Sequence, residues 1–302
     1  MITYINNLKK SDLEQIPNGD THYAFKKDKE RELYHILLGN YNKEQGQIVK
    51  FSSARSIYNM LDNNTMNMCS LVCMNDPSEL DYADNYGEEI EEIQRESDTK
   101  MKISNAQNIF IISCCREEVE QDLTMWRLYA DDTQGVCIRF EVDENKLNKN
   151  GFYIAPVSYA QDVSSHFELE IIKKIREKLR TSWQIEIREW EVWKHFFKKK
   201  LYSIEKEIRL LYFPAEDVFS ASVNNKWFID DRTSTYTEMK LFNISNQYSH
   251  FPLSVSKVIL GVKFPNKKLN TVLLNYRFDE SNIIHSNNKE EIVTSSKIED
   301  YR

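Results

Sequence analysis

Glycine is scarce in this chain, with 7 residues among 302. Loops that cradle phosphate groups in P-loop and dinucleotide-binding folds need clustered glycines, and no Gly-x-Gly sequence occurs here. Apolar runs are short as well, and none approaches the roughly 20 residues that a transmembrane helix needs. The sequence therefore argues against ATPases, kinases and Rossmann enzymes, and no membrane partner is expected.

Cysteine and histidine show no spacing typical of a metal site. The five cysteines include Cys69-x3-Cys73 in a β-like stretch and the adjacent pair Cys114-Cys115, which does not suit zinc. The six histidines fall in no ligand spacing, so no metal is expected. The cysteine count is odd, and Met1–Tyr4 lacks the basic start and apolar run of a signal peptide. We therefore expect a cytoplasmic protein with free thiols.

The composition predicts a globular chain with a local basic region. Apolar residues make up 41% of the chain and aromatic residues 12%, as in ordinary folded domains. The formal charge of −7 weakly disfavours a dedicated nucleic-acid binder, because phosphate contacts need concentrated Lys and Arg. Lys198–Lys200 is nevertheless a basic run. Such a run either follows a phosphate backbone or is the solvated end of a helix.

Helix and strand patterns are intermixed without a regular βαβ alternation, which predicts an α+β fold. Residues 1–45 are expected to form an accessory segment with a helix near 28–38, ahead of a single α+β catalytic domain over 46–302. Strands are expected over 48–53, 65–74, 108–114, 135–141, 151–159, 207–213 and 256–263. Helices are expected over 54–62, 78–101, 122–130 and 168–200, and from residue 266 onward.

The first of three polar boxes is Asn75-Asp76-Pro77-Ser78-Glu79. Proline fixes its own φ and disfavours the helical region at Asp76, so the box is a turn. Asp76 and Glu79 could bind a ribose or a metal, or move a proton. The alternative is a capped turn, in which Asp76 or Ser78 caps the following acidic helix and Glu79 occupies its first turn.

The second box is Met125-Trp126-x-x-Tyr129 on an expected short helix. Two aromatic residues three apart share one helix face and could stack on a planar ring. Core packing is the alternative, because aromatic residues at helical spacing are usually buried.

The third box, Glu205-Lys206-Glu207-Ile208-Arg209, reads as part of a strand. Residues two apart on a strand point the same way, so Glu205, Glu207 and Arg209 are expected on one face. We expect Glu207 to matter more than Glu205, because it lies inside the strand and Glu205 at its start. A solvated sheet face is the alternative interpretation.

The order of these boxes resembles the bacterial family called domain of unknown function 2971. That family has an L-Y-H-Y-T-S strand, an N-D-P-x-E turn, an M-W-x-x-Y-A helix before G-V-C-I-x-F, and a W-x-x-E-x-E-x-R strand. The resembling segments, within about residues 48 to 276, are 48–53, 75–79, 110–114, 125–130, 135–140, 202–209 and 256–261. Lys50 stands where the family most often has histidine.

More distantly, the early strand and the late glutamate strand resemble ADP-ribosyltransferases that modify nucleic acids. This resemblance implies a mixed or antiparallel split sheet with flanking helices, and NAD as the substrate. The NAD-binding residues that it implies are Lys50, Ser52, Ser53, Asn75, Asp76, Glu79, Trp126 and Tyr129, of which Trp126 or Tyr129 would stack on the nicotinamide. It also implies that Glu205 or Glu207 is the catalytic carboxylate, and that Arg209 binds the diphosphate or keeps that carboxylate ionised.

The leading interpretation is therefore an NAD-dependent ADP-ribosyltransferase that modifies a macromolecule as a toxin or phage-defence effector. The basic run Lys198–Lys200 favours nucleic acid over protein as the target, and an antitoxin or defence-complex partner is expected. One alternative is a metal-dependent nuclease or hydrolase that uses Asp76, Glu79 and Glu207. The other is a non-enzymatic interaction module of a defence complex.

Overall fold

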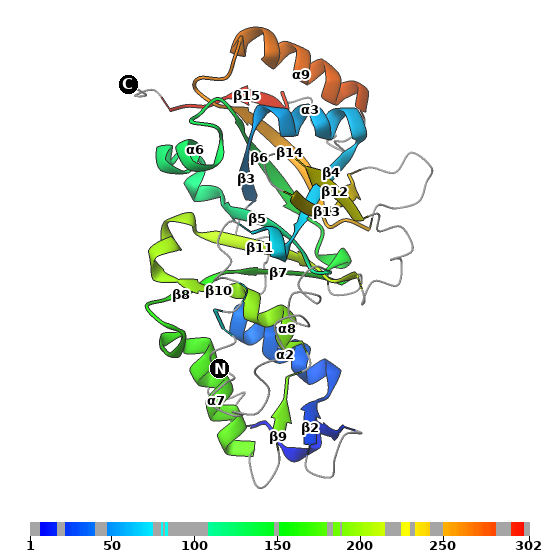
Figure 1. Cartoon of the computed structure of the whole chain (residues 1–302), viewed down its shortest axis with the longest axis vertical. Helices are drawn as coiled ribbons and strands as arrows, with labels where there is room; N and C mark the ends of the chain where they lie inside the picture. Colours follow the sequence, from blue (N-terminus) through cyan, green and yellow to red (C-terminus); the bar gives the residue numbers. More distant parts are fainter. Residues whose placement is uncertain are drawn as a thin grey trace. The chain divides into compact units, whose positions relative to one another are not determined.

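A computed structural model gives the fold as two compact units (Figure 1). Unit 1 comprises residues 1–41, 75–102 and 155–204, and unit 2 comprises 42–74, 103–154 and 205–302. The structure describes residues 7–16, 22–39, 47–74, 80, 82–83, 108–147, 151–179, 184–187, 189–214, 225–229, 233–241, 250–281 and 291–298. The expected division into an accessory segment over 1–45 and a domain over 46–302 stays a prediction.

Unit 1 combines short strands with helices. Strands β1 (Leu13–Gln15), β2 (His22–Phe25) and β9 (Gln184–Glu186) form one small sheet, and β8 (Ser158–Ala160) pairs with β10 (Phe197–Lys199). The helices are α2 (Lys27–Leu38), α7 (Phe167–Leu179) and α8 (Trp190–Trp193). A helix near 28–38 is confirmed. The single helix expected over 168–200 is wrong beyond Leu179, because the later segment forms β9, α8 and β10 instead, with Trp190 and Trp193 in α8 and Phe197 in β10.

Unit 2 is built on one large sheet that is mixed and largely antiparallel, and the chain is α+β as predicted. The main path of the sheet is β12-β13-β4-β5-β3-β6-β14-β15, with β11 also paired to β5 and β7 paired to β11. Its strands are β3 (Ile48–Ser52), β4 (Thr65–Ser70), β5 (Phe110–Arg116), β6 (Val136–Val142), β7 (Phe152–Pro156), β11 (Glu207–Tyr212), β12 (Asn225–Ile229), β13 (Thr233–Lys240), β14 (Leu253–Leu260) and β15 (Val293–Ser295). The helices are α3 (Ala54–Asn63), α6 (Leu123–Tyr129) and α9 (Lys267–Ser281).

The sheet splits beside its central strand β5. Strand β3 pairs with one end of β5, at Val49 and Cys115, and β4 pairs with the other end, at Cys69 and Ile111. Between these points β3 turns to its other neighbour β6, and β4 turns to β13. Helix α3 connects the two diverging strands. The sheet therefore forms two arms that separate along the middle of β5.

A buried cluster holds α6 against one face of the sheet near β3. Trp126 and Met125 of α6 pack there with Val49, Phe51 and Cys115. Asp122 caps α6, because its carboxylate accepts a hydrogen bond from the backbone nitrogen of Thr124 at 2.8 Å. We call this side of the sheet, which carries Val49 and Cys115, the covered face.

Gly135 has no room for a side chain, because the backbone at the end of β3 approaches it closely. A Cβ atom at Gly135 would lie 2.2 Å from the carbonyl oxygen of Ser52, which is shorter than any van der Waals contact. Gly135 directly precedes β6, the partner of β3. The absence of a side chain at this position therefore lets β6 begin against the last residue of β3.

Candidate functional site

A pocket of about 450 Å³ lies where the two arms of the sheet separate. Its wall is formed by β3 on one side, by β4 and β13 on the other, and by α3. The lining residues include Lys50, Ser52, Ser53, Arg55, Ser56, Asn67, Cys69, Tyr236 and Glu238. The pocket lies within unit 2. We call it the split-sheet pocket.

Lys50 extends from β3 into the split. Its Nζ donates a hydrogen bond to the carbonyl oxygen of Ser113 at 3.3 Å. Ser113 lies on β5 between the points where β3 and β4 are paired to that strand. The lysine therefore places a positive charge at the base of the split-sheet pocket, where the sequence predicted an NAD contact.

Three serine hydroxyls gather at the N-terminus of α3. The Oγ of Ser52 donates to the Oγ of Ser56 at 2.8 Å, and the Oγ of Ser53 lies 3.1 Å from the same atom. Ser53 is the N-cap residue of α3, but its side chain makes no capping hydrogen bond. Arg55 in the first turn adds a second cation to the pocket wall. Hydroxyl donors, a helix N-terminus and two cations together suit an anionic ligand.

The opposite wall carries a carboxylate that the sequence analysis missed. Glu238 and Tyr236 of β13 pair with Asn67 and Cys69 of β4, and all four residues line the pocket. Their neighbours Thr235, Thr237 and Met239 are buried, so Tyr236 and Glu238 occupy the alternate positions of a two-residue repeat. This alternation was the available signal, although it does not reveal which strand β13 pairs with.

Glu207 and Arg209 lie elsewhere, as a buried ion pair. The Nε of Arg209 donates to Oε1 of Glu207 at 2.8 Å and its Nη2 donates to Oε2 at 3.2 Å. The side chains of Arg209 and Glu207 are 1% and 3% exposed. Glu207 is paired with Cys115, and Cys115 with Val49, so Glu207 shares the covered face. Lys50, the residue after Val49, points to the other face. Of these two residues, Lys50 lines the split-sheet pocket and Glu207 is not among its lining residues.

Glu205 is not on strand β11, and the prediction that it shares a strand face with Glu207 is wrong. It ends a 3-10 helix over Lys200–Glu205, and Lys206 then adopts a positive φ of 43° before the strand begins. The hydroxyl of Tyr129 donates to Oε1 of Glu205 at 2.6 Å. Burial, followed by this hydrogen bond, raises the pKa of Tyr129. Glu207 also raises it, so the two glutamates and Tyr129 form one neighbourhood.

The two aromatic residues of α6 have different surroundings. Trp126 is fully buried, its Nε1 donates to the carbonyl oxygen of Glu120 at 2.7 Å, and its ring meets Phe51 edge-on. It therefore offers no ring face to a ligand. Tyr129 is 41% exposed, and of the two it is the ring that a ligand can reach.

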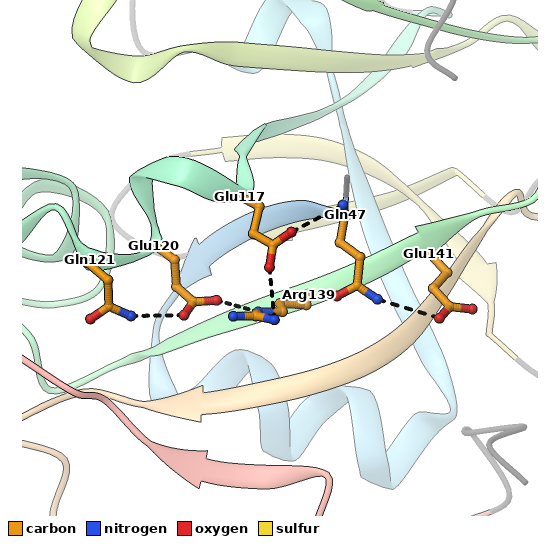
Figure 2. A network of polar contacts seen from close by, with 6 residues as sticks. All are labelled: Gln47, Glu117, Glu120, Gln121, Arg139 and Glu141. Carbon is orange, nitrogen blue, oxygen red and sulfur yellow. Dashed lines mark hydrogen bonds and ion pairs between the residues drawn. The ribbon is translucent and has the colours of Figure 1, made fainter. Parts of the chain in front are cut away.

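A polar network on β6 was also missed by the sequence analysis (Figure 2). Arg139 lies between two glutamates of the 3-10 helix Glu117–Gln121. Its Nη1 lies 2.9 Å from Oε1 of Glu117, and its Nε donates to Oε2 of Glu120. Glu120 is 6% exposed. These contacts fasten the 3-10 helix that leads into α6, so we interpret the network as structural.

The remaining predicted residues divide between those outside the described part of the chain and those that the structure places. Asn75, Asp76 and Glu79 lie outside the described residues. In the basic run, Lys198 is 6% exposed and lies over the ring of Tyr202, whereas Lys199 and Lys200 are exposed. Among the described residues, no group of three His, Cys, Asp or Glu side chains could hold a metal.

The cysteines are free thiols, as predicted. Burial raises the pKa of Cys114 to about 12, which disfavours the thiolate that a cysteine nucleophile needs. No described helix is long and apolar enough to cross a membrane.

Residues 125–210 match the family described as "Protein of unknown function (DUF2971)". The resemblance drawn from the sequence is confirmed over this stretch. The matched stretch includes Trp126, Tyr129, Glu205, Glu207 and Arg209. Of the residues that line the split-sheet pocket, Ile138 lies within the matched stretch, and the others, including Lys50, lie outside it. A comparison with curated proteins and one with solved structures find no match. The family description carries no activity, so any function is a proposal.

Proposed function

We propose that the chain is an ADP-ribosyltransferase that binds NAD in the split-sheet pocket and modifies a macromolecule. The observation that carries the proposal is that Lys50, Arg55 and the carboxylate of Glu238 line one pocket of about 450 Å³. Ligand pockets commonly have volumes of about 300–1,000 Å³. NAD has an anionic diphosphate that cations would bind and ribose hydroxyls that a carboxylate would bind.

Each wall of the pocket has a role in this proposal. The positive charges of Lys50 and Arg55, together with the N-terminus of α3, would neutralise the negative charge of the diphosphate. The hydroxyls of Ser52 and Ser53 would contact a ribose, as the resemblance implies. Glu238 would accept a hydrogen bond from the 2′-hydroxyl of the nicotinamide ribose. A carboxylate in that position stabilises the positive charge that develops on the ribose as the bond to nicotinamide breaks.

The transfer itself is balanced without a further reactant. A nucleophilic oxygen or nitrogen of the target attacks C1′ of the ribose, the bond from C1′ to the nicotinamide nitrogen breaks, and nicotinamide leaves as a neutral molecule. The proton of the target group passes to solvent. Glu238 supplies the catalytic carboxylate in this proposal, because Glu207 and Glu205 are not among the residues that line the split-sheet pocket. Catalysis by Glu207 is the competing version.

As in the sequence analysis, we propose a bacterial effector with a nucleic-acid target. The exposed side chains of Lys199 and Lys200 support this choice. An antitoxin or a defence-complex partner belongs to the same proposal.

The deciding experiment supplies labelled NAD together with bacterial RNA, DNA or protein, and measures nicotinamide release and labelled product. We expect label on nucleic acid, loss of activity in Glu238→Gln, and weaker NAD binding by calorimetry in Lys50→Ala and Arg55→Ala. Lys263→Ala is the matched control, because it removes an exposed cation of unit 2 that pairs with Asp132 outside the pocket. Calorimetry that detects no NAD binding, or nucleic-acid cleavage that EDTA abolishes, would overturn the proposal.

A further inference from the structure

Helix α9 carries an apolar stripe on its outward face. Leu269, Val272, Leu273 and Tyr276 are 59%, 66%, 49% and 60% exposed. Their spacing of three or four residues places them together on one side of the helix. Four large apolar side chains in a row differ from the scattered exposed apolar residues of an ordinary surface, and such patches mark interaction sites.

The opposite side of α9 is already packed within unit 2. Leu274 and Phe278 are buried, and α9 contacts β15 and α3. The side chain of Asn275 fixes β15, because its Oδ1 accepts from the backbone nitrogen of Val293 at 2.8 Å. The stripe is therefore a second apolar face, beyond the one that docks the helix onto its own sheet.

The charges at the ends of α9 are the reverse of those that the helix dipole favours. Lys267 and Lys268 occupy the first turn, and Asp279 and Glu280 the last turn. Cations are favourable near a helix C-terminus and anions near its N-terminus. Each end of α9 would thus be stabilised by an opposite charge brought by a binding partner.

We propose that this stripe binds a second copy of the chain, with the two α9 helices antiparallel about a two-fold axis. A two-fold interface must be complementary to itself. The stripe meets this condition, because Leu269 and Tyr276 lie equally far from a midpoint between Val272 and Leu273. Antiparallel helices also bring Lys267 and Lys268 of one copy towards Asp279 and Glu280 of the other.

The neighbouring contacts fit this arrangement. Tyr58 of α3 is 40% exposed, and its hydroxyl lies 3.5 Å from Oδ1 of Asn270, so it extends the stripe. Arg277 of α9 forms an ion pair with Asp62, with 2.9 Å between Nη2 of Arg277 and Oδ1 of Asp62. From Leu269 to Tyr276 the stripe is only about 10 Å long, at roughly 1.5 Å per residue. A contact of this length gives a weak dimer that forms at high concentration.

Sedimentation of the full chain over a range of concentrations tests the apolar part of the proposal. The wild type should dimerise reversibly, and Val272→Asp should weaken the dimer at least about tenfold, because it places a charge in the centre of the contact. Leu201→Asp is the matched control, since Leu201 is 69% exposed and outside the stripe. A wild type that stays monomeric at every concentration, or a Val272→Asp dimer of unchanged affinity, would overturn the proposal.

A charge exchange tests the antiparallel orientation. One variant carries Lys267→Glu and Lys268→Glu, and the other carries Asp279→Lys and Glu280→Lys. Each variant alone places like charges at both ends of its dimer, whereas a mixture places opposite charges at both ends. We expect each variant to dimerise more weakly than the wild type, and the mixture to form heterodimers that added salt weakens. Homodimers as stable as the heterodimer would overturn the antiparallel arrangement.

Discussion

Unit 2 places ionisable side chains in two contrasting environments, the split-sheet pocket and the covered face. In the pocket, Lys50, Arg55 and Glu238 each retain exposed surface, so solvent or a ligand can reach them. On the covered face, Arg209 and Glu207 are almost wholly buried and neutralise each other. The sequence pointed to the second group as the catalytic one. The difference shows that charge on a strand favours a ligand site only where a ligand can approach it.

The largest expected effect on stability comes from breaking the buried ion pair between Arg209 and Glu207. Arg209→Ala leaves the carboxylate of Glu207 buried without its bidentate partner, and such a loss costs about 3–5 kcal/mol in the free energy of unfolding. Urea denaturation measures it. Arg277→Ala, which removes an exposed ion pair with Asp62, should change that free energy far less. Full stability of Glu207→Gln combined with lost transferase activity would instead place Glu207 in the catalytic machinery.

The next prediction concerns the pocket carboxylate. Glu238→Gln should lower the rate of nicotinamide release by about 10²–10³, the range for removal of one preorganised charge at a developing cation. Its melting temperature should stay near that of the wild type, because Glu238 is only partly buried. A variant that keeps the wild-type rate would remove Glu238 from the proposed mechanism.

A smaller effect is expected where the pocket wall depends on a glycine. Gly135→Ala would place a methyl group 2.2 Å from the carbonyl oxygen of Ser52, so β3 or β6 must shift. Overpacking of this kind costs about 1–3 kcal/mol. Because Ser52 lines the pocket, NAD binding measured by calorimetry should weaken as well. Unchanged stability and binding would show that this end of β3 is not held in place by its neighbour.

The smallest effect is expected at the edge of the covered face. Tyr129→Phe removes the hydrogen bond to Glu205 and should cost about 0.5–1.5 kcal/mol. The folded protein raises the pKa of Tyr129, so its protonated hydroxyl contributes stability at neutral pH that is lost as the pH rises above about 10. Urea denaturation at several pH values should show this decline reduced in Tyr129→Phe. An equal decline in both proteins would assign it to other groups.

Local sequence patterns predicted most of the individual elements. Ile57 and Leu61 at helical spacing, with Ser53 as the N-cap, indicated α3, and the β-branched run at 109–112 indicated the buried strand β5. Both rest on interactions between residues close in sequence. In unit 1 the same reasoning extended one helix too far, because the apolar residues beyond Leu179 pack as β9, α8 and β10.

The candidate site was harder to predict, because it depends on strand register. Glu238 and Lys50 line one pocket only because β13 pairs with β4 and both diverge from β5, and no local pattern encodes that pairing. The position of Glu205 was missed for another reason. Lys206 takes a positive φ, which is uncommon for lysine, so the strand begins only at Glu207 and Glu205 stays outside it.

The separation of β3 and β4 from β5 has a consequence for hydrogen exchange. A central strand is normally the most protected part of a sheet, but between Ile111 and Cys115 neither β3 nor β4 pairs with the edge of β5 that faces them in the described registers. The carbonyl oxygen of Ser113 on this edge accepts its hydrogen bond from a lysine side chain. The amide of Ser113 should therefore exchange faster than those of Ile111 and Cys115. Any small molecule that fills the split should slow it, which turns this one amide into a reporter for ligands of unknown identity.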